Sequence, residues 1–149
     1  MSKPRFCQLF HRMANSPAYR DLNPPARALL TEFQLIYLPS LNGRLSISTR
    51  NAAQQINITE KTARKAFNDL AEHGFIELIS GHSWMDKKAR EWRLTFEKTN
   101  NQSATDEWQK WTPGKVIFRL PKQPKKRLRK NNSRRSILPQ TAVDSPPVL

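Results

Sequence analysis

The alternation of apolar and polar positions is clearest in residues 56–78, "INITEKTARKAFNDLAEHGFIEL". Four apolar positions recur there at helical spacing and predict one buried face: Ala63, Ala66, Phe67 and Leu70. Thr59 is a favourable N-cap because its hydroxyl can accept a hydrogen bond from a free backbone N–H. Gly74 ends the pattern where a left-handed residue is needed. The pattern therefore predicts an amphipathic helix over residues 59–73.

The segment before this helix predicts a second, shorter helix. Leu45 and Ile47 alternate with polar residues, as in a short half-buried strand. Ser48 can cap a helix whose buried face comprises Ala52, Ala53 and Ile56. Two short helices joined by so tight a turn are typical of a helix-turn-helix.

The segment after the helix predicts a β-hairpin. Residues 75–80, "FIELIS", indicate one strand, and residues 90–96, "REWRLTF", indicate a second with alternating Trp92, Leu94 and Phe96. The polar loop 81–89 joins them. Helix, short strand, helix, turn, helix and hairpin is the order of elements in a winged helix.

Two further helices are predicted near the N-terminus. Phe6, Leu9, Phe10 and Met13 share a face and indicate a short N-terminal helix. Asn23 and Pro24 open a helix extending to about residue 38. Its inward positions are expected to be Leu29, Leu30, Phe33, Ile36 and Tyr37.

The C-terminal third divides into a linker, a tryptophan-containing turn and a tail. Trp108 and Trp111 fall on one side of a helical turn after the linker 99–105. They cap the core of their own domain in one interpretation and form a homodimer contact in the other, because exposed aromatic pairs mark interfaces. Prolines and the missing apolar periodicity predict that residues 119–149 are disordered.

The charge of the chain points to a polyanionic partner. The formal net charge is +14, and residues 99–149 carry 11 basic groups against 3 acidic ones. Nucleic acid is the expected partner, and a membrane surface is the weaker alternative. On the exposed face of the predicted helix 59–73, the N-terminal turns carry cationic or hydrogen-bonding side chains and the C-terminal end carries acidic ones. A helix that enters the major groove by its N-terminal residues needs this polarity, although a solvated face of mixed charge looks the same.

Other function classes find little support in the sequence. The three histidines are scattered without metal-ligand spacing, and the four glycines form no phosphate-binding loop. We therefore expect no enzyme, no metal and no cofactor. A single cysteine excludes an internal disulfide and indicates a reducing compartment. With no apolar run that could span a bilayer and no signal-peptide core, the protein is expected in the cytoplasm.

The segment "STRNAAQQINITEKTARKAFNDLAEHGFIEL" resembles the winged helix-turn-helix domains of GntR-type transcription regulators. The positions that carry the resemblance are Ser48, Arg50, Thr62, Arg64, Leu70, Gly74, Phe75 and Ile76. The resemblance covers roughly residues 44–80 and implies DNA binding. The effector-binding domain of that family is not seen in the chain, so no small-molecule ligand is expected.

A second resemblance covers about residues 16–112. "SPAYRDLNPPARALLTEF", "NGRLSIS" and "AREWRLTF" are similar to small winged-helix proteins of phage and plasmid genes, some labelled as replication-initiation or replication-associated. The chain is short for the paired winged helices of a full plasmid initiator. This resemblance implies an accessory role in replication and a bacterial, nucleoid-associated location.

The predicted fold class is α+β: a winged helix-turn-helix with a three-helix core and a β-hairpin wing. An N-terminal helix precedes this core, and a disordered basic tail follows it. Residues 1–98 form the DNA-binding domain, residues 99–118 a linker and a tryptophan segment packing on it, and residues 119–149 the tail.

The predicted DNA contacts lie at the start of the first helix of the pair, on the recognition helix 59–73 and in the wing 81–90. They are Ser48, Thr49, Arg50, Thr59, Lys61, Thr62, Arg64, Lys65, Asn68, His82, Lys87, Lys88 and Arg90. The tail is predicted to add non-specific phosphate contacts through Lys122, Lys125, Lys126, Arg127, Arg129, Lys130, Arg134 and Arg135.

Two functions remain open from the sequence. In the first, the protein binds a specific double-stranded DNA site as a small transcription regulator or replication accessory factor. In the second, it is a non-enzymatic interaction protein that keeps the winged-helix fold and uses its basic tail to bind RNA or an acidic protein.

Overall fold

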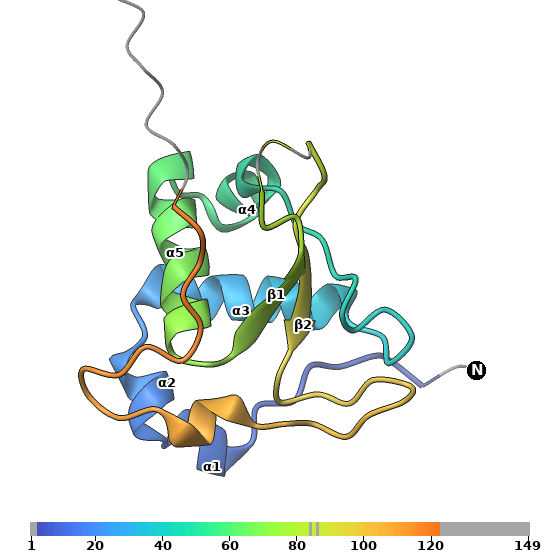
Figure 1. Ribbon diagram of the computed structural model, residues 1–149. Helices are drawn as coiled ribbons and strands as arrows, with labels where there is room; N and C mark the ends of the chain where they lie inside the picture. Colours follow the sequence, from blue (N-terminus) through green and yellow to red (C-terminus); the bar gives the residue numbers. More distant parts are fainter. Residues whose placement is uncertain (1–2, 84, 86, 123–149) are drawn as a thin grey trace, which may run out of the picture.

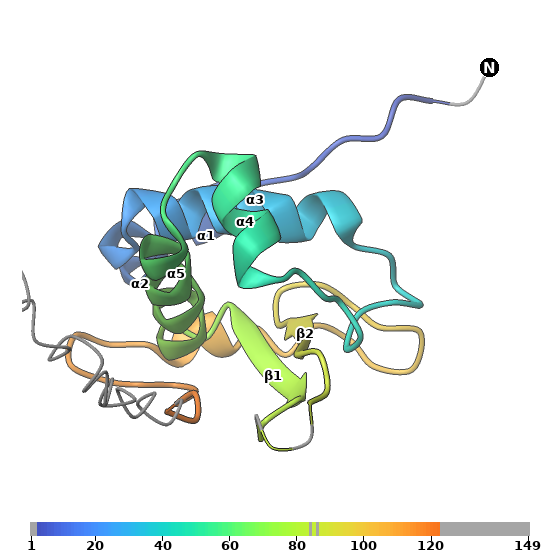
Figure 2. The same cartoon turned by 90° about the horizontal axis from the view of Figure 1, so that it is seen from above.

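The structure is a computed structural model that describes residues 3–83, 85 and 87–122. It is a small α+β fold of helices packed against a two-stranded antiparallel sheet (Figure 1). The helices and strands are α1 (His11–Ala14), α2 (Pro17–Asp21), α3 (Pro24–Ile36), α4 (Thr49–Ile56), α5 (Glu60–Glu72), β1 (Ile76–Ser80) and β2 (Glu91–Leu94). A short 3-10 helix, η2 (Glu107–Lys110), follows the sheet. Seen from above, α3 and α4 lie on one side of α5, and the segment leading to residue 122 lies on the other (Figure 2).

The two helices predicted around the tight turn are both present. Ser48 accepts a hydrogen bond from the backbone N of Asn51 at 3.0 Å, and Thr59 accepts one from the backbone N of Thr62 at 3.2 Å. Asn57 ends α4 in the left-handed region with φ of 56°. These caps satisfy backbone groups that a helix end leaves free, which explains why α4 and α5 begin where the sequence indicates.

The hairpin is also present, but the predicted strand before α4 is reduced to one residue. Strands β1 and β2 pair antiparallel, with Ile76 opposite Leu94. Leu45 forms an isolated bridge with Trp92, in which Leu45 N donates to Trp92 O at 3.1 Å and Trp92 N to Leu45 O at 2.7 Å. Pairing stops there because the chain turns into the cap of α4 only three residues later.

An aromatic cluster joins α3, α5 and the sheet. The ring of Phe67 stacks on Trp92 with centroids 5.4 Å apart and meets Phe33 edge-on at 5.9 Å. Leu29 and Leu30 of α3 are buried as predicted. The inward assignment of Ile36 is wrong, since 38% of its surface is exposed. The chain leaves the helix after this residue, and Tyr37 is half-buried, its hydroxyl donating to Lys98 O at 2.8 Å.

The predicted N-terminal helix is wrong for most of its length. Phe6, Leu9 and Phe10 lie outside any helix and are exposed, and only Met13 enters the core, from the single turn of α1. Helical spacing alone does not make a helix when no partner surface buries its apolar face. Ser16 instead starts a new helix, α2, by accepting from Tyr19 N at 3.2 Å.

The tryptophan segment packs on the end of α5. Trp108 is 5% exposed and stacks on Phe75, and Trp111 is 8% exposed and stacks on His73 at 4.7 Å. The condition for the dimer interpretation, an exposed aromatic pair, is therefore not met. A Cβ on Gly74 would lie 3.0 Å from backbone atoms of residues 107 and 108, so this glycine allows the close approach.

The structure describes four residues of the predicted basic tail, 119–122. Leu120 is half-buried against the core, so packing continues beyond residue 118. Residues 123–149 lie outside the described part of the chain, and so do the predicted phosphate contacts from Lys125 to Arg135. Within the described ranges, no helix is long and apolar enough to cross a bilayer.

Candidate nucleic-acid interface

The side of α5 that faces away from the core carries four of the predicted DNA-contacting residues. Lys61, Arg64, Lys65 and Asn68 are all exposed. Arg64 has one acidic neighbour on the helix, Glu60, at 4.0 Å. An exposed pair at that distance contributes little, so the guanidinium stays available to another partner.

A groove lies beside this surface, and we call it the α5 groove. It has a volume of about 340 Å³. Its walls are formed by Thr49, Lys61, Arg64, Lys65, Phe67, Asn68, Arg90, Leu120, Pro121 and Lys122. Five of these side chains are cationic, and none of the described side chains in its wall is acidic. A concave surface lined by one sign of charge concentrates ions of the opposite sign, so the α5 groove favours an anion.

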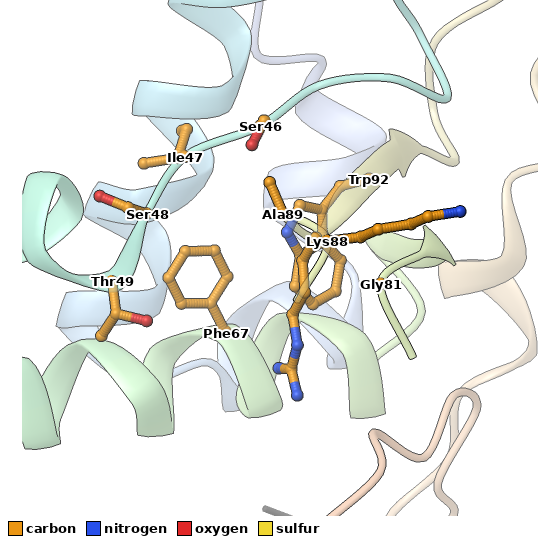
Figure 3. Close-up of a pocket in the computed structure, with 10 residues that line it drawn as sticks. Ser46, Ile47, Ser48, Thr49, Phe67, Gly81, Lys88, Ala89 and Trp92 are labelled. Carbon is orange, nitrogen blue, oxygen red and sulfur yellow. The ribbon is translucent and has the colours of Figure 1, made fainter. Parts of the chain in front are cut away.

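A second hollow adjoins the groove at the base of the hairpin, and we call it the hairpin-base pocket (Figure 3). It has a volume of about 290 Å³ and is lined by Ser46, Ile47, Ser48, Thr49, Phe67, Gly81, Lys88, Ala89, Arg90 and Trp92. Thr49, Phe67 and Arg90 belong to both hollows. In Figure 3 the Lys88 side chain extends past Gly81 and away from Phe67. Because they share three residues, the two hollows form one cleft from the hairpin to α5, with its cations concentrated in the α5 groove.

Arg90 lies at the junction of the two hollows because the hairpin strands approach closely there. Gly81 has φ of 80°, and a Cβ on it would lie 2.8 Å from Ala89 O and from Arg90 Cα. Only glycine fits this position without shifting the backbone that carries Arg90. Burial lowers the pKa of the Arg90 guanidinium. An arginine remains charged under such conditions, so the groove keeps this positive charge at neutral pH.

Several predicted contact residues are engaged in the local structure of the helices. Ser48 and Thr59 are caps, and the Thr59 and Thr62 hydroxyls lie 2.9 Å apart. Their hydroxyls already accept or share hydrogen bonds within the protein. This favours a structural role for these side chains, which fix where α4 and α5 begin.

The remaining predicted residues lie outside the cleft. Arg50 and Lys87 are exposed and line neither hollow. His82 is exposed and borders a separate hollow of about 260 Å³ with residues 117–121. The structure thus brings together seven of the predicted residues in the α5 groove: Thr49, Lys61, Arg64, Lys65, Asn68, Arg90 and Lys122.

Leu120 and Pro121 form part of the groove wall but were not among the residues predicted from the sequence. The available signal was the apolar run in "KVIFRL", residues 115–120, just before the basic tail. Among the described residues, no group of three or more His, Cys, Asp or Glu side chains could hold a metal ion.

Comparison of the chain with protein-family models, with curated proteins and with solved structures finds no match. The function proposed below therefore rests on the residues and their geometry.

Proposed function

We propose that the protein binds double-stranded DNA in a sequence-dependent manner, as a winged helix-turn-helix. In this proposal α5 is the recognition helix and the β1–β2 hairpin is the wing. The observation that carries it is the α5 groove, in which five cations and Asn68 gather on and beside the exposed side of α5. Such a concentration of positive charge, without an acidic side chain in the described wall, fits a phosphate backbone.

The dimensions of α5 suit the major groove. A helix with its side chains is about 10–12 Å across, and the major groove of B-DNA is about 12 Å wide. Arg64 and Asn68 are one helical turn apart on the exposed side. Arginine makes bidentate contacts with guanine and asparagine with adenine, so these two side chains would contact base edges.

The other cations would hold the phosphates on either side. Lys61 and Lys65 flank the base-contacting pair, and Arg50 lies near the start of α4. Lys87 and Lys88 of the hairpin loop are exposed and would meet the backbone of the duplex. These contacts position the protein without specifying sequence.

In this role the protein acts as a small transcription regulator or a replication accessory factor of a phage- or plasmid-like element, in the cytoplasm and without enzymatic activity. The resemblance in residues 16–112 supports the second role, and the resemblance in residues 44–80 supports the first.

Selection of duplexes from a random pool by the full-length protein tests the proposal. We expect a consensus of a few adjacent base pairs, bound more tightly than a scrambled duplex of the same length. A pool that shows no enrichment, or equal affinity for selected and scrambled duplexes, would refute sequence-dependent binding.

A further inference from the structure

The segment Ile117–Lys122 runs along α5 from the C-terminal end of the helix towards its N-terminal half (Figure 1). Its backbone is attached at one end, since Ile117 N donates to Glu72 O at 2.8 Å and Phe118 N donates to Ala71 O at 3.2 Å. These carbonyls belong to the last turn of α5, where a helix lacks partners of its own. The segment therefore completes the end of α5.

Apolar contacts hold the rest of the segment in place. Ile117, Phe118 and Leu120 are half-buried against the core. Leu120 and Pro121 line the α5 groove, and Lys122 stands in its wall together with Arg64 and Lys65 of the helix. This arrangement brings a cation into a groove that is already cationic, so charge alone would drive the segment away. The apolar contacts of Ile117, Phe118 and Leu120, which we call the apolar anchor, offset that repulsion. An anion bound in the groove would remove the repulsion by neutralising the cations.

We propose that the C-terminal segment is the second wall of a phosphate clamp. One phosphodiester of the DNA strand beside α5 lies between the helix and the segment, contacted by Lys122 from one side and by Lys65 and Arg90 from the others. The inference rests on the proposed function, because it assumes that α5 occupies a major groove.

The width of the duplex groove supports this placement. A helix about 10–12 Å across already fills a groove about 12 Å wide, which leaves no room inside for an extended chain. A segment fixed beside α5 must then lie at the edge of the groove, where the phosphates are. Lys122 consequently meets the DNA backbone.

One lysine in the C-terminal segment and one just before it allow a matched comparison. Lys122 lines the α5 groove, whereas Lys115 is exposed and lines neither the groove nor the hairpin-base pocket. Lys122→Ala and Lys115→Ala remove the same charge from full-length protein. Leu120→Ser removes the apolar anchor and leaves every charge in place, and urea unfolding checks that this variant is folded.

The experiment measures affinity for the selected duplex at several salt concentrations. Lys122→Ala should make the slope of log affinity against log salt less negative by about 0.9. Its loss of affinity between 50 and 200 mM salt should therefore be about threefold smaller than that of the wild type. Lys115→Ala should leave the slope unchanged. Leu120→Ser should lower affinity although its net charge is that of the wild type.

A scan of the duplex with single neutral methylphosphonates locates the clamped phosphate. At one position the methylphosphonate should lower the affinity of the wild type for the duplex and have little further effect on the affinity of Lys122→Ala. Equal behaviour of the two lysine variants, with an Arg64→Ala effect intact, would overturn the clamp and leave the proposed function standing. Tighter binding after deletion of residues 119–149 would also overturn it, since the segment would then cover the site. Absence of any duplex preference in the wild type would refute the proposed function itself.

Discussion

The His73 side chain links α2, α5 and the tryptophan segment, and it should make stability depend on pH. Its Nε2 lies 2.7 Å from Asp21 Oδ2, and its Nδ1 lies 2.7 Å from Asp69 O and 3.2 Å from Asp69 Oδ1. Its ring stacks on Trp111, and the side chain is 6% exposed. Burial lowers the pKa, but the hydrogen bonds to Asp69 and Asp21 outweigh it and raise the pKa of His73 to about 9.

The sign of the effect follows from the proton uptake of the two states. Below pH 6.5 the histidine is protonated in both the folded and the unfolded chain, and its interactions with the aspartates stabilise the fold in full. Between pH 6.5 and about 9 the unfolded chain loses the proton first, so this stabilisation decreases and is lost above pH 9. A pKa raised from 6.5 to about 9 corresponds to about 3 kcal/mol of unfolding free energy.

Urea unfolding at a series of pH values from about 6 to 10 measures this loss over the window in which the histidine titrates. His73→Gln should be less stable than the wild type at the acid end and should lack most of the decrease towards the alkaline end. His82→Gln is the matched control because His82 is exposed. If the wild type and His73→Gln lost stability in parallel over this range, the assignment of a protonated histidine between two aspartates would be refuted.

Three further substitutions test the core and the base of the hairpin. Phe67→Ala should lower the free energy of unfolding by about 3–5 kcal/mol, because the buried Phe67 ring stacks within the aromatic cluster. An unchanged midpoint of urea unfolding would contradict the burial of this ring in the core. Asn42→Ala should lower the free energy of unfolding by about 1–3 kcal/mol for each backbone group left unpaired, because Asn42 Oδ1 accepts from Leu94 N at 2.7 Å and Nδ2 donates to three carbonyls. An unchanged thermal unfolding midpoint would contradict these hydrogen bonds. Gly81→Ala should weaken duplex binding by shifting Arg90. Gly114→Ala is the control because Gly114 has φ of 85° but nothing within 4 Å of an added Cβ, and it should leave the affinity unchanged. Equal affinities of the two variants would contradict the close contact of Gly81 with residues 89 and 90.

The parts of the fold that the sequence predicted are those with local signals. Ser48 and Thr59 as caps, and Gly74 with φ of 83° after α5, define the helix ends by interactions within a few residues. The same holds for the strand alternation around Trp92. Each of these signals depends on residues close together in the sequence, so it does not require the rest of the fold.

The parts that were missed depend on contacts distant in sequence. Phe6 and Phe10 have helical spacing, but both side chains are exposed, and the segment lies outside any helix. Asn42 looks like an ordinary turn residue until the fold brings the backbone around Leu94 against it. Leu120 belongs to the wall of the α5 groove because residues 117–118 pair with the end of α5, more than 40 residues earlier in the chain. The apolar run 115–120 indicates burial but not this partner.

The candidate site was predicted in part for the same reason. Lys61, Arg64, Lys65 and Asn68 share one helix, so their common face follows from periodicity alone. The presence of Arg90 and Lys122 beside them follows from the packing of the hairpin and the C-terminal segment on α5, which the structure supplies.

The central claim is that α5 contacts the bases, and a titration of Arg64→Ala tests it most directly. Affinity is measured for the selected duplex and for each of its single base-pair variants, with Arg20→Ala as the control because Arg20 is an exposed arginine on α2 outside the α5 groove. Arg64→Ala should cost about 1–3 kcal/mol on the preferred duplex and remove the preference at one or two base pairs. Arg20→Ala should keep both affinity and preference. Full discrimination by Arg64→Ala at every base pair would contradict the assignment of α5 as the recognition helix.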